Sequence, residues 1–277
     1  MENYNEIKKL AKDIRISMLK MLVNLGFGHF GGSLSVVETL AVLYGGVMKI
    51  DPKNPDWDER DYMVLSKGHA GPALYAALAI KGYFPREELM TLNINGTHLP
   101  SHPDRLLTKG VDATTGSLGQ GVSLATGIAM AEKISGKDNR VFTILGDGEL
   151  NEGQCWEAFQ FIAHHNLNNL TVFVDYNKLQ LDGTLEEIIK PFSLTEKFKA
   201  FGFDSVEVKG DDIEGIYNLV KNKRGENERP LAIILNTKKG QGVEYIENLK
   251  NSHHMRLTDE VKAEVEKAIA ELEGEVE

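Results

Sequence analysis

Two polar positions follow apolar stretches at a spacing that suits the binding of a divalent metal ion. A Gly-Asp-Gly tripeptide centred on Asp147 comes directly after an apolar run, and Asn177 comes just after the next apolar run along the chain. If the two runs are neighbouring strands of a parallel sheet, both side chains lie on the rim where such sheets bind ligands. Together with the main-chain carbonyl of Leu179, they offer the hard oxygen ligands that Mg²⁺ or Ca²⁺ prefers.

Two neighbouring features extend this candidate metal site toward an anionic ligand. Gly148 has no side chain, so the backbone there can approach a diphosphate closely. A helix is expected from about Glu152, and its N-terminal end carries a partial positive charge. Because Gly-Asp-Gly alone is a common turn signal, the interpretation depends on its place between two buried strands.

The elements that would position these residues alternate between strands and helices. Strands are expected at 62–65, 141–145, 170–175, 204–208 and 231–235, and helices at 4–25, from Ser33 or Ser35 to about Tyr44, and at 70–81, 118–134, 152–165, 195–201, 212–223 and 258–273. The segment 93–115 shows no period and is expected as a long loop, which in compact domains is usually functional or disordered. The pattern predicts an α/β fold with a mostly parallel sheet and helices on both faces.

Composition and charge restrict the class of protein. The chain has 277 residues, 42% hydrophobic and 26% charged, which is ordinary for a globular protein, and we expect a single domain, 1–277, ending in the helix at about 258–273. The net charge of −10 argues against nucleic-acid binding. No apolar run approaches the ~20 residues of a membrane-spanning helix, and the polar N-terminus is unlike a signal sequence. Cys155, the only cysteine, excludes an internal disulfide and fits a reducing cytoplasm.

Several segments resemble the N-terminal, thiamine-diphosphate-binding half of transketolases. In that family the cofactor motif begins with Gly-Asp-Gly and closes on an Asn after the next strand, as GDGELNEGQCWEA and YNK do here. The other matching segments occur in the family's order: GHFGGSLS (28–35), SKGHAGPALYA (66–76), LPSHPD (99–104), TTGSLGQG (114–121) and TKKGQG (237–242). The short chain is similar to stand-alone N-terminal subunits, so the resemblance implies one half of a split, two-subunit transketolase.

The resemblance implies a set of cofactor-binding residues. Asp147, Asn177 and the carbonyl of Leu179 would bind Mg²⁺, with Ca²⁺ or Mn²⁺ as substitutes. Gly148 would contact the diphosphate of thiamine diphosphate. Gly116 and Leu118 would lie against the cofactor, with Leu118 near its aminopyrimidine ring.

Four histidines lie in segments that match the family. The resemblance places His29 near the reactive carbon of the cofactor, His69 near the diphosphate and His102 near the hydroxyls of the donor sugar. The family has one more active-site histidine after the segment that matches TKKGQG. His253 fits its position better than His254, although the flanking residues match only in part. Ketol transfer needs groups that donate and accept protons at neutral pH, which histidine can do.

The remaining titratable candidates have alternative interpretations. His164 and His165 are expected as ordinary surface or hydrogen-bonded residues, and His98 stays open. Glu152 either caps its helix and faces solvent, or, as the resemblance implies, faces a subunit interface near the cofactor, where a buried carboxylate would have a raised pKa and could relay protons.

The resemblance also implies a partner. In transketolases, the glutamate that activates the aminopyrimidine and the residues that bind the sugar phosphate lie in a second domain that this sequence does not contain. We therefore expect an α2β2 assembly with a C-terminal transketolase subunit, active in ketol transfer between sugar phosphates of the pentose phosphate pathway. Alone, the chain should bind the cofactor weakly or not at all.

Three alternatives remain. The chain could belong to another thiamine-diphosphate enzyme, such as 1-deoxyxylulose-5-phosphate synthase or a 2-oxo acid dehydrogenase component, although SKGHA, SHPD and NEG favour transketolase. It could act on an unusual sugar as a specialised ketol transferase. It could also be a non-catalytic regulatory subunit, against which the intact Asp147 and Asn177 pair and the four histidines argue.

Overall fold

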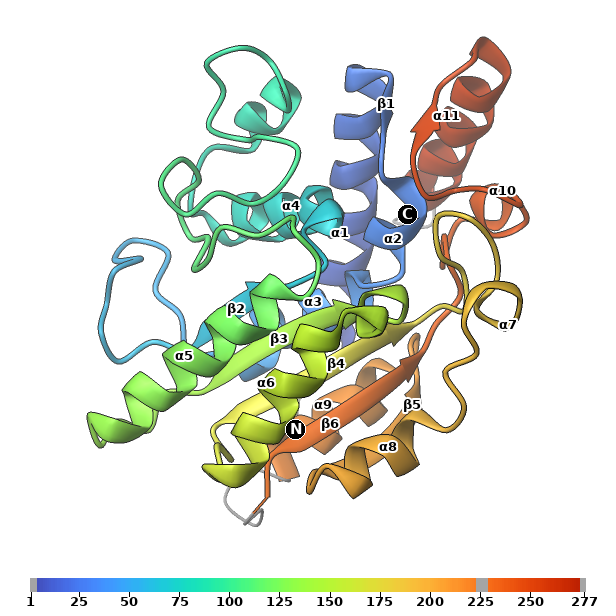
Figure 1. Cartoon of the computed structure of the whole chain (residues 1–277). Helices are drawn as coiled ribbons and strands as arrows, with labels where there is room; N and C mark the ends of the chain where they lie inside the picture. Colours follow the sequence, from blue (N-terminus) through green and yellow to red (C-terminus); the bar gives the residue numbers. More distant parts are fainter. Residues whose placement is uncertain (1–3, 223–228, 275–277) are drawn as a thin grey trace.

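The computed structural model describes residues 4–222 and 229–274, and a five-stranded parallel sheet forms its centre (Figure 1). Every neighbouring pair of strands in it is parallel. In spatial order the strands are β2 (Tyr62–Leu65), β3 (Val141–Gly146), β4 (Leu170–Tyr176), β6 (Leu231–Asn236) and β5 (Asp204–Lys209). The predicted α/β fold is confirmed, and all five predicted strands are present.

Helices cover both faces of the sheet, which explains why its central strands are apolar throughout. Alternate residues of β3 enter two different cores: Phe142 and Ile144 belong to one, and Val141 and Leu145 to the other. The first core is built with α1 (Tyr4–Leu25), α3 (Val37–Val42), α4 (Gly71–Lys81), α9 (Ile213–Asn222) and α11 (Asp259–Gly274). The second is built with α5 (Gln120–Ile134), α6 (Gly153–His164) and α8 (Leu194–Ala200).

The parallel arrangement brings four loops to one edge of the sheet. Gly146 of β3 pairs in register with Asp175 of β4, so the chain leaves both strands at the same level. The loops after β2 and β6 leave at that edge as well, because these strands run in the same direction. Four of the segments that resembled the cofactor-binding family, which begin at Ser66, Gly146, Tyr176 and Thr237, therefore lie at the carboxyl ends of the strands.

The N-terminal part of the chain differs from the sequence expectation. The helix expected from Ser33 or Ser35 begins earlier and is broken into α2 (Phe30–Leu34), α3 and a π-helical turn, η1 (Leu43–Val47). The hydroxyl of Ser35, at the break, donates a hydrogen bond to the Asp175 carboxylate at 2.6 Å. This buried contact fixes a bend that helical periodicity does not encode.

Several short elements were also not expected. A two-stranded antiparallel sheet pairs β1 (Phe27–Gly28) with β7 (Met255–Arg256). A strand of two residues is too short to show an alternation of apolar and polar residues in the sequence, so only the structure reveals these two strands. The other short elements are η2 (Gly68–Ala70), η3 (Arg86–Thr91), η4 (Gly148–Asn151), α7 (Leu185–Ile188) and α10 (Glu244–Glu247).

The sequence expectation that no apolar run approaches the length of a membrane-spanning helix was wrong, because the stretch 30–47 is long and apolar enough by composition to cross a membrane. In the fold it is broken into α2, α3 and η1, and 83% of it is buried inside the protein. These are the features of core helices rather than of a membrane span.

Candidate active site

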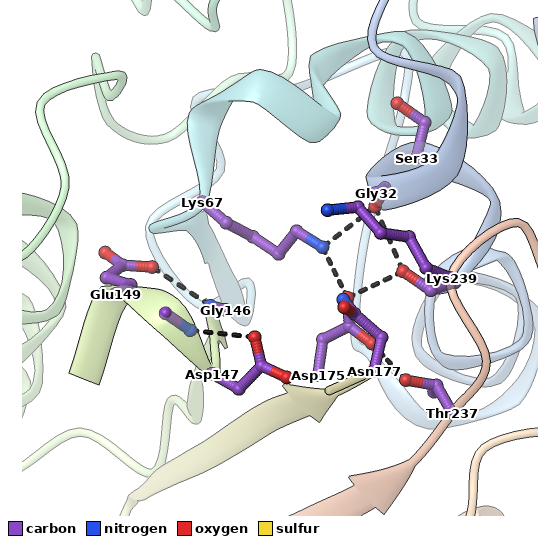
Figure 2. A network of polar contacts seen from close by, with 12 residues as sticks. Gly32, Ser33, Lys67, Gly146, Asp147, Glu149, Asp175, Asn177, Thr237 and Lys239 are labelled. Carbon is purple, nitrogen blue, oxygen red and sulfur yellow. Dashed lines mark hydrogen bonds and ion pairs between the residues drawn. The ribbon is translucent and has the colours of Figure 1, made fainter. Parts of the chain in front are cut away.

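The loops after β3 and β4 bring Asp147 and Asn177 to one rim of the sheet (Figure 2). The Asp147 carboxylate accepts hydrogen bonds from the backbone N–H groups of Gly148 (2.7 Å) and Lys178 (2.6 Å). Lys178 has a φ of 69°, which is uncommon for a residue with a side chain, and the sharp turn directs its N–H group toward Asp147. The structure thus brings the two predicted ligands together, while their binding of a metal stays a prediction.

The orientation of the Asn177 amide is fixed by a buried carboxylate. Its nitrogen, Nδ2, donates to Oδ2 of Asp175 at 2.8 Å, and its oxygen, Oδ1, accepts the N–H group of Leu179 at 3.1 Å. Asp175 is fully buried and also accepts hydrogen bonds from Ser35 and Thr237. Since the nitrogen is committed to Asp175, the oxygen is the amide atom left for a cation.

A buried lysine neutralises Asp175. The ammonium of Lys67 lies 2.5 Å from Oδ2 of Asp175 and donates to the carbonyl of Gly32 at 2.8 Å (Figure 2). Burial would raise the pKa of Asp175, but Lys67 and the hydroxyl donors outweigh it and hold that pKa below its usual value. Asp175 is therefore charged and internally paired, which separates its role from that of Asp147.

Within residues 4–222 and 229–274, Asp147 has no such direct ion pair, and the charge of Lys67 is the smallest of the effects that lower its pKa. Burial, and then the neighbouring charge of Asp175, raise the pKa of Asp147 to about 7, although two backbone N–H groups favour the charged form. A divalent cation beside this carboxylate would compensate for its burial and restore its charge. The electrostatics of Asp147 thus suit a metal ligand.

Lys239 lines the candidate site, and sequence reasoning did not single it out. Its ammonium donates to the carbonyl of Leu179 at 2.8 Å and lies 3.3 Å from Nδ1 of His253. Burial, and then the charge of Lys67, lower the pKa of Lys239 to about 8. Lys239 belongs to the TKKGQG segment, so the segment was recognised, but a lysine beside another lysine does not reveal which one points inward.

The residues present fit a diphosphate held through a metal. A cavity of about 190 Å³ is lined by Asp147, Asn177, Leu179 and Lys239, among others. In residues 4–222 and 229–274, no group of three His, Cys, Asp or Glu side chains could hold a metal ion, so a metal would depend on the mixed set of carboxylate, amide and carbonyl oxygens. Nε2 of Gln180, which also lines the cavity, is a buried donor without a partner. Such a donor, with a lysine, suits an anionic ligand.

Four predicted histidines form one cluster beside this cavity. The ring of His29 lies 5.5 Å from that of His69, 5.8 Å from that of His102 and 5.3 Å from that of His253. His69 and His253 line the cavity, with their rings 4.9 Å apart. His254 also contacts His29, at 4.8 Å, but its ring is exposed and does not line the cavity. The position nearest the cavity is therefore that of His253, as the sequence favoured.

The protein holds these imidazoles neutral. Burial, and then neighbouring histidines, lower the pKa of His29 to about 3. Burial, and then Lys239, lower the pKa of His253 to about 4. Burial also lowers the pKa of His102 and, joined by Lys67, that of His69. Neutral rings can both donate and accept hydrogen bonds at neutral pH.

The loop containing Gly116 and Leu118 closes one side of the site. A side chain on Gly68 would meet the backbone nitrogen of Gly116 at 2.7 Å, so the two loops pack through glycine. A side chain on Gly116 would meet the ring of His102 at 3.1 Å. Leu118 lines the cavity with 37% of its surface exposed, so an apolar surface is available to a bound ring system.

The buried carboxylate after Gly-Asp-Gly is Glu149, which sequence reasoning missed. Glu149 is 2% exposed and accepts hydrogen bonds from the hydroxyl of Ser66 and the N–H groups of Gly119 and Gly146. It therefore ties three loops of the site together. Glu152 is exposed at the start of α6, without a side-chain capping bond, and its predicted place at a subunit interface stays a prediction.

The other histidines lie outside the cluster of four. The rings of His164 and His165 meet edge to face at the end of α6, 4.7 Å apart, and His165 also contacts Phe161. His98 is exposed in the long loop. Their positions agree with the ordinary surface role assigned to His164 and His165.

The family model described as "Transketolase, thiamine diphosphate binding domain" matches residues 7–271. The chain is 49% identical over 275 residues to the "6-deoxy-6-sulfo-D-fructose transketolase subunit SqwG" of Clostridium sp. (strain MSTE9), covering 99% of this chain and 98% of that protein. It is 39% identical to an apulose-4-phosphate transketolase subunit of Actinobacillus succinogenes, over 99% and 98% of the two chains. The crystal structure of transketolase from Campylobacter jejuni superposes with a TM-score of 0.89 at 30% identity, over 97% of this chain but 43% of that one.

Proposed function

The chain belongs to the family of transketolase thiamine-diphosphate-binding domains, and from this premise we propose that it is the diphosphate-binding subunit of a two-subunit ketol transferase. The observation that carries the proposal is the convergence of two sets of residues at one edge of the sheet. One set is the oxygen-lined cavity of Asp147, Asn177 and Leu179, and the other is the histidine cluster beside it.

The cofactor and this chain would have separate tasks. Thiamine diphosphate, when bound, supplies the carbanion chemistry that cuts a two-carbon ketol unit from a ketose and passes it to an aldose. Asp147, Asn177 and the Leu179 carbonyl would hold Mg²⁺ against the diphosphate. Lys239 and Gln180 would donate hydrogen bonds to the same anionic group, and Leu118 would contact the ring system.

The histidines would manage protons on the sugar. Because burial keeps His29 and His253 neutral, either ring can accept a proton from a hydroxyl group or donate one to a developing alkoxide. His102, whose ring packs beside that of His29, would bind a hydroxyl group of the donor. His69 lines the cavity and would contact the cofactor.

A second chain would complete the site. This chain covers 43% of the Campylobacter jejuni transketolase but 98% of the Clostridium subunit, which supports a division of the catalytic halves between two polypeptides. Leu118 and Glu152 are exposed near the cavity, where a partner would cover them. We propose a C-terminal transketolase subunit as that partner, in an α2β2 assembly.

The similarity to a sulfofructose transketolase subunit favours a ketose with an anionic terminal group as the donor. At 49% identity over nearly the full length, 6-deoxy-6-sulfo-D-fructose is the first donor to test. Fructose 6-phosphate and xylulose 5-phosphate represent the pentose phosphate alternative.

The proposal is tested by reconstitution with a partner homologous to the C-terminal half of full-length transketolases. Ketol transfer from each donor to glyceraldehyde 3-phosphate is measured for this chain, for the partner and for the mixture, with and without thiamine diphosphate and Mg²⁺. We expect transfer only from the mixture with both cofactors present. Transfer by this chain alone would refute the split site, and an inactive mixture that nevertheless binds cofactor would favour a regulatory subunit.

A further inference from the structure

His254 lies beside the cluster of four histidines, against His29, and the proposed function leaves it without a role. Its position next to His29 follows from the small sheet of β1 and β7. The ladder pairs Phe27 with Arg256 and Gly28 with Met255. One further step in this antiparallel register places His254 opposite His29, and side chains at such cross-strand positions lie close together. The 4.8 Å between the two rings agrees with this.

Other contacts hold this end of the ladder in place. The N–H group of Leu257 donates to the carbonyl of Gly26 at 2.9 Å, which closes the ladder on its far side. The ring of His254 also packs against Phe27, with 5.9 Å between the ring centres. The backbone thus fixes where His254 stands, while its ring remains exposed to solvent.

The rings of His69, His253 and His29 form a triangle beside the cavity, and the exposed ring of His254 packs against the His29 corner of it. His69 lines the cavity and packs beside Gly32 and Lys67. In this triangle the ring of His253 lies 4.9 Å from that of His69 and 5.3 Å from that of His29, and the rings of His69 and His29 are 5.5 Å apart. His254 is outside the triangle, with its ring 4.8 Å from that of His29. His69 and His253 line the cavity, whereas His254 is exposed beside His29. A sugar whose reacting carbons lie by the triangle and whose remaining carbons extend toward solvent past His29 would meet the ring of His254.

We propose, on the basis of the function proposed above, that His254 binds a hydroxyl group of the sugar beyond the two carbons that are transferred. It is then a specificity-determining residue that contacts long substrates and leaves short ones untouched. Since the aldose part of donor and product occupies the same outer region, His254 serves donors and acceptors alike.

The test compares long and short substrates on the reconstituted two-subunit complex. The long pair is 6-deoxy-6-sulfo-D-fructose or xylulose 5-phosphate with an aldose phosphate. The short pair is hydroxypyruvate, which loses its carboxylate as CO₂ and leaves the same two-carbon unit, with glycolaldehyde as acceptor. Neither short substrate carries a hydroxyl group beyond the two transferred carbons of the donor that would reach His254.

For His254→Ala we expect the KM of the long substrates to rise about 3- to 10-fold, the range for loss of one hydrogen bond, with kcat within about twofold. The short pair should keep its kcat and KM, and calorimetry should show unchanged binding of thiamine diphosphate with Mg²⁺. His254→Gln, which keeps hydrogen-bonding groups, should recover part of the loss. His164→Ala, an exposed histidine on α6, is the matched control and should change neither pair.

Two results would overturn this assignment. If His254→Ala leaves the KM of every long substrate unchanged, the residue does not bind the sugar. If it slows the short pair equally, or weakens cofactor binding, it acts by supporting His29 instead. A wild-type complex inactive with both pairs would refute the proposed function and this assignment together, whereas a wild type active on both isolates the role of His254.

Discussion

Replacement of Lys67 by methionine should show how strongly the fold depends on the ion pair beneath the active site. Lys67 and Asp175 are 1% and 0% exposed at their side chains, and their charged atoms lie 2.5 Å apart. Without the ammonium, Asp175 keeps hydrogen bonds from Ser35, Thr237 and Asn177, but no cation. Removal of one partner from a buried pair typically costs about 3–5 kcal/mol.

For a chain of this size, about 1 kcal/mol changes Tm by roughly 2–4 °C. Lys67→Met should therefore lower Tm by roughly 6–20 °C, as measured by differential scanning calorimetry and urea unfolding. The double variant Lys67→Met/Asp175→Asn removes both charges, so its loss should be smaller than the sum of the single losses by about 2–3 kcal/mol.

An exposed ion pair supplies the control for this comparison of single and double variants. Lys199 and Glu196 lie 2.8 Å apart with side chains 54% and 69% exposed. Lys199→Met should cost less than about 0.5 kcal/mol, as is usual for exposed pairs. The reasoning fails if Lys67→Met lowers the free energy of unfolding no more than Lys199→Met does. It also fails if the loss in the double variant equals the sum of the losses in Lys67→Met and Asp175→Asn.

Three more residues of the site give predictions of their own. Lys239→Met should tighten Mn²⁺ binding in the absence of thiamine diphosphate, because the ammonium no longer occupies the Leu179 carbonyl that the metal needs. The same substitution should weaken binding of the diphosphate. Weaker Mn²⁺ binding in a spectroscopic titration would contradict this prediction. Gly148→Ala should weaken cofactor binding in calorimetry by about tenfold, equal to about 1.4 kcal/mol, because the new carbon meets the Gln180 side chain at 3.1 Å. Gly153→Ala, with open space around the new carbon, should leave cofactor binding unchanged. Equal effects of the two substitutions would refute the close approach of the diphosphate to Gly148. The free energy of unfolding should fall as the pH drops from 7 to 5, because His29 and His253 have pKa values of about 3 and 4 in the folded protein, whereas histidines of the unfolded chain take up protons near ~6.5. In urea unfolding, His253→Gln should reduce this dependence of the free energy on pH. A pH dependence unchanged by that substitution would contradict the prediction.

Much of the sheet could be predicted from local sequence. The apolar runs at 141–145 and 170–175 are typical of strands buried on both faces, and the polar residues after them were enough to locate the rim. Asp147 and Asn177 were found because glycine and a change from apolar to polar residues mark the ends of strands. These signals depend only on neighbours in the chain.

What could not be predicted depends on contacts between distant segments. Lys67 and Lys239 are buried because Asp175 and the Leu179 carbonyl accept their hydrogen bonds, and nothing in their own neighbourhood indicates this. Glu149, rather than Glu152, is the buried carboxylate because donors from the loops at Ser66 and Gly119 meet it.

The most direct test of the proposed metal site is the position of a metal ion in crystals of the two-subunit complex grown with thiamine diphosphate and Mn²⁺. Anomalous scattering from manganese should give one peak at about 2 Å from oxygen atoms of Asp147, Asn177 and Leu179, with the diphosphate as a further ligand and Lys239 moved off the Leu179 carbonyl. A diphosphate bound with no metal peak at that rim, or a peak that touches neither Asp147 nor Asn177, would contradict the account.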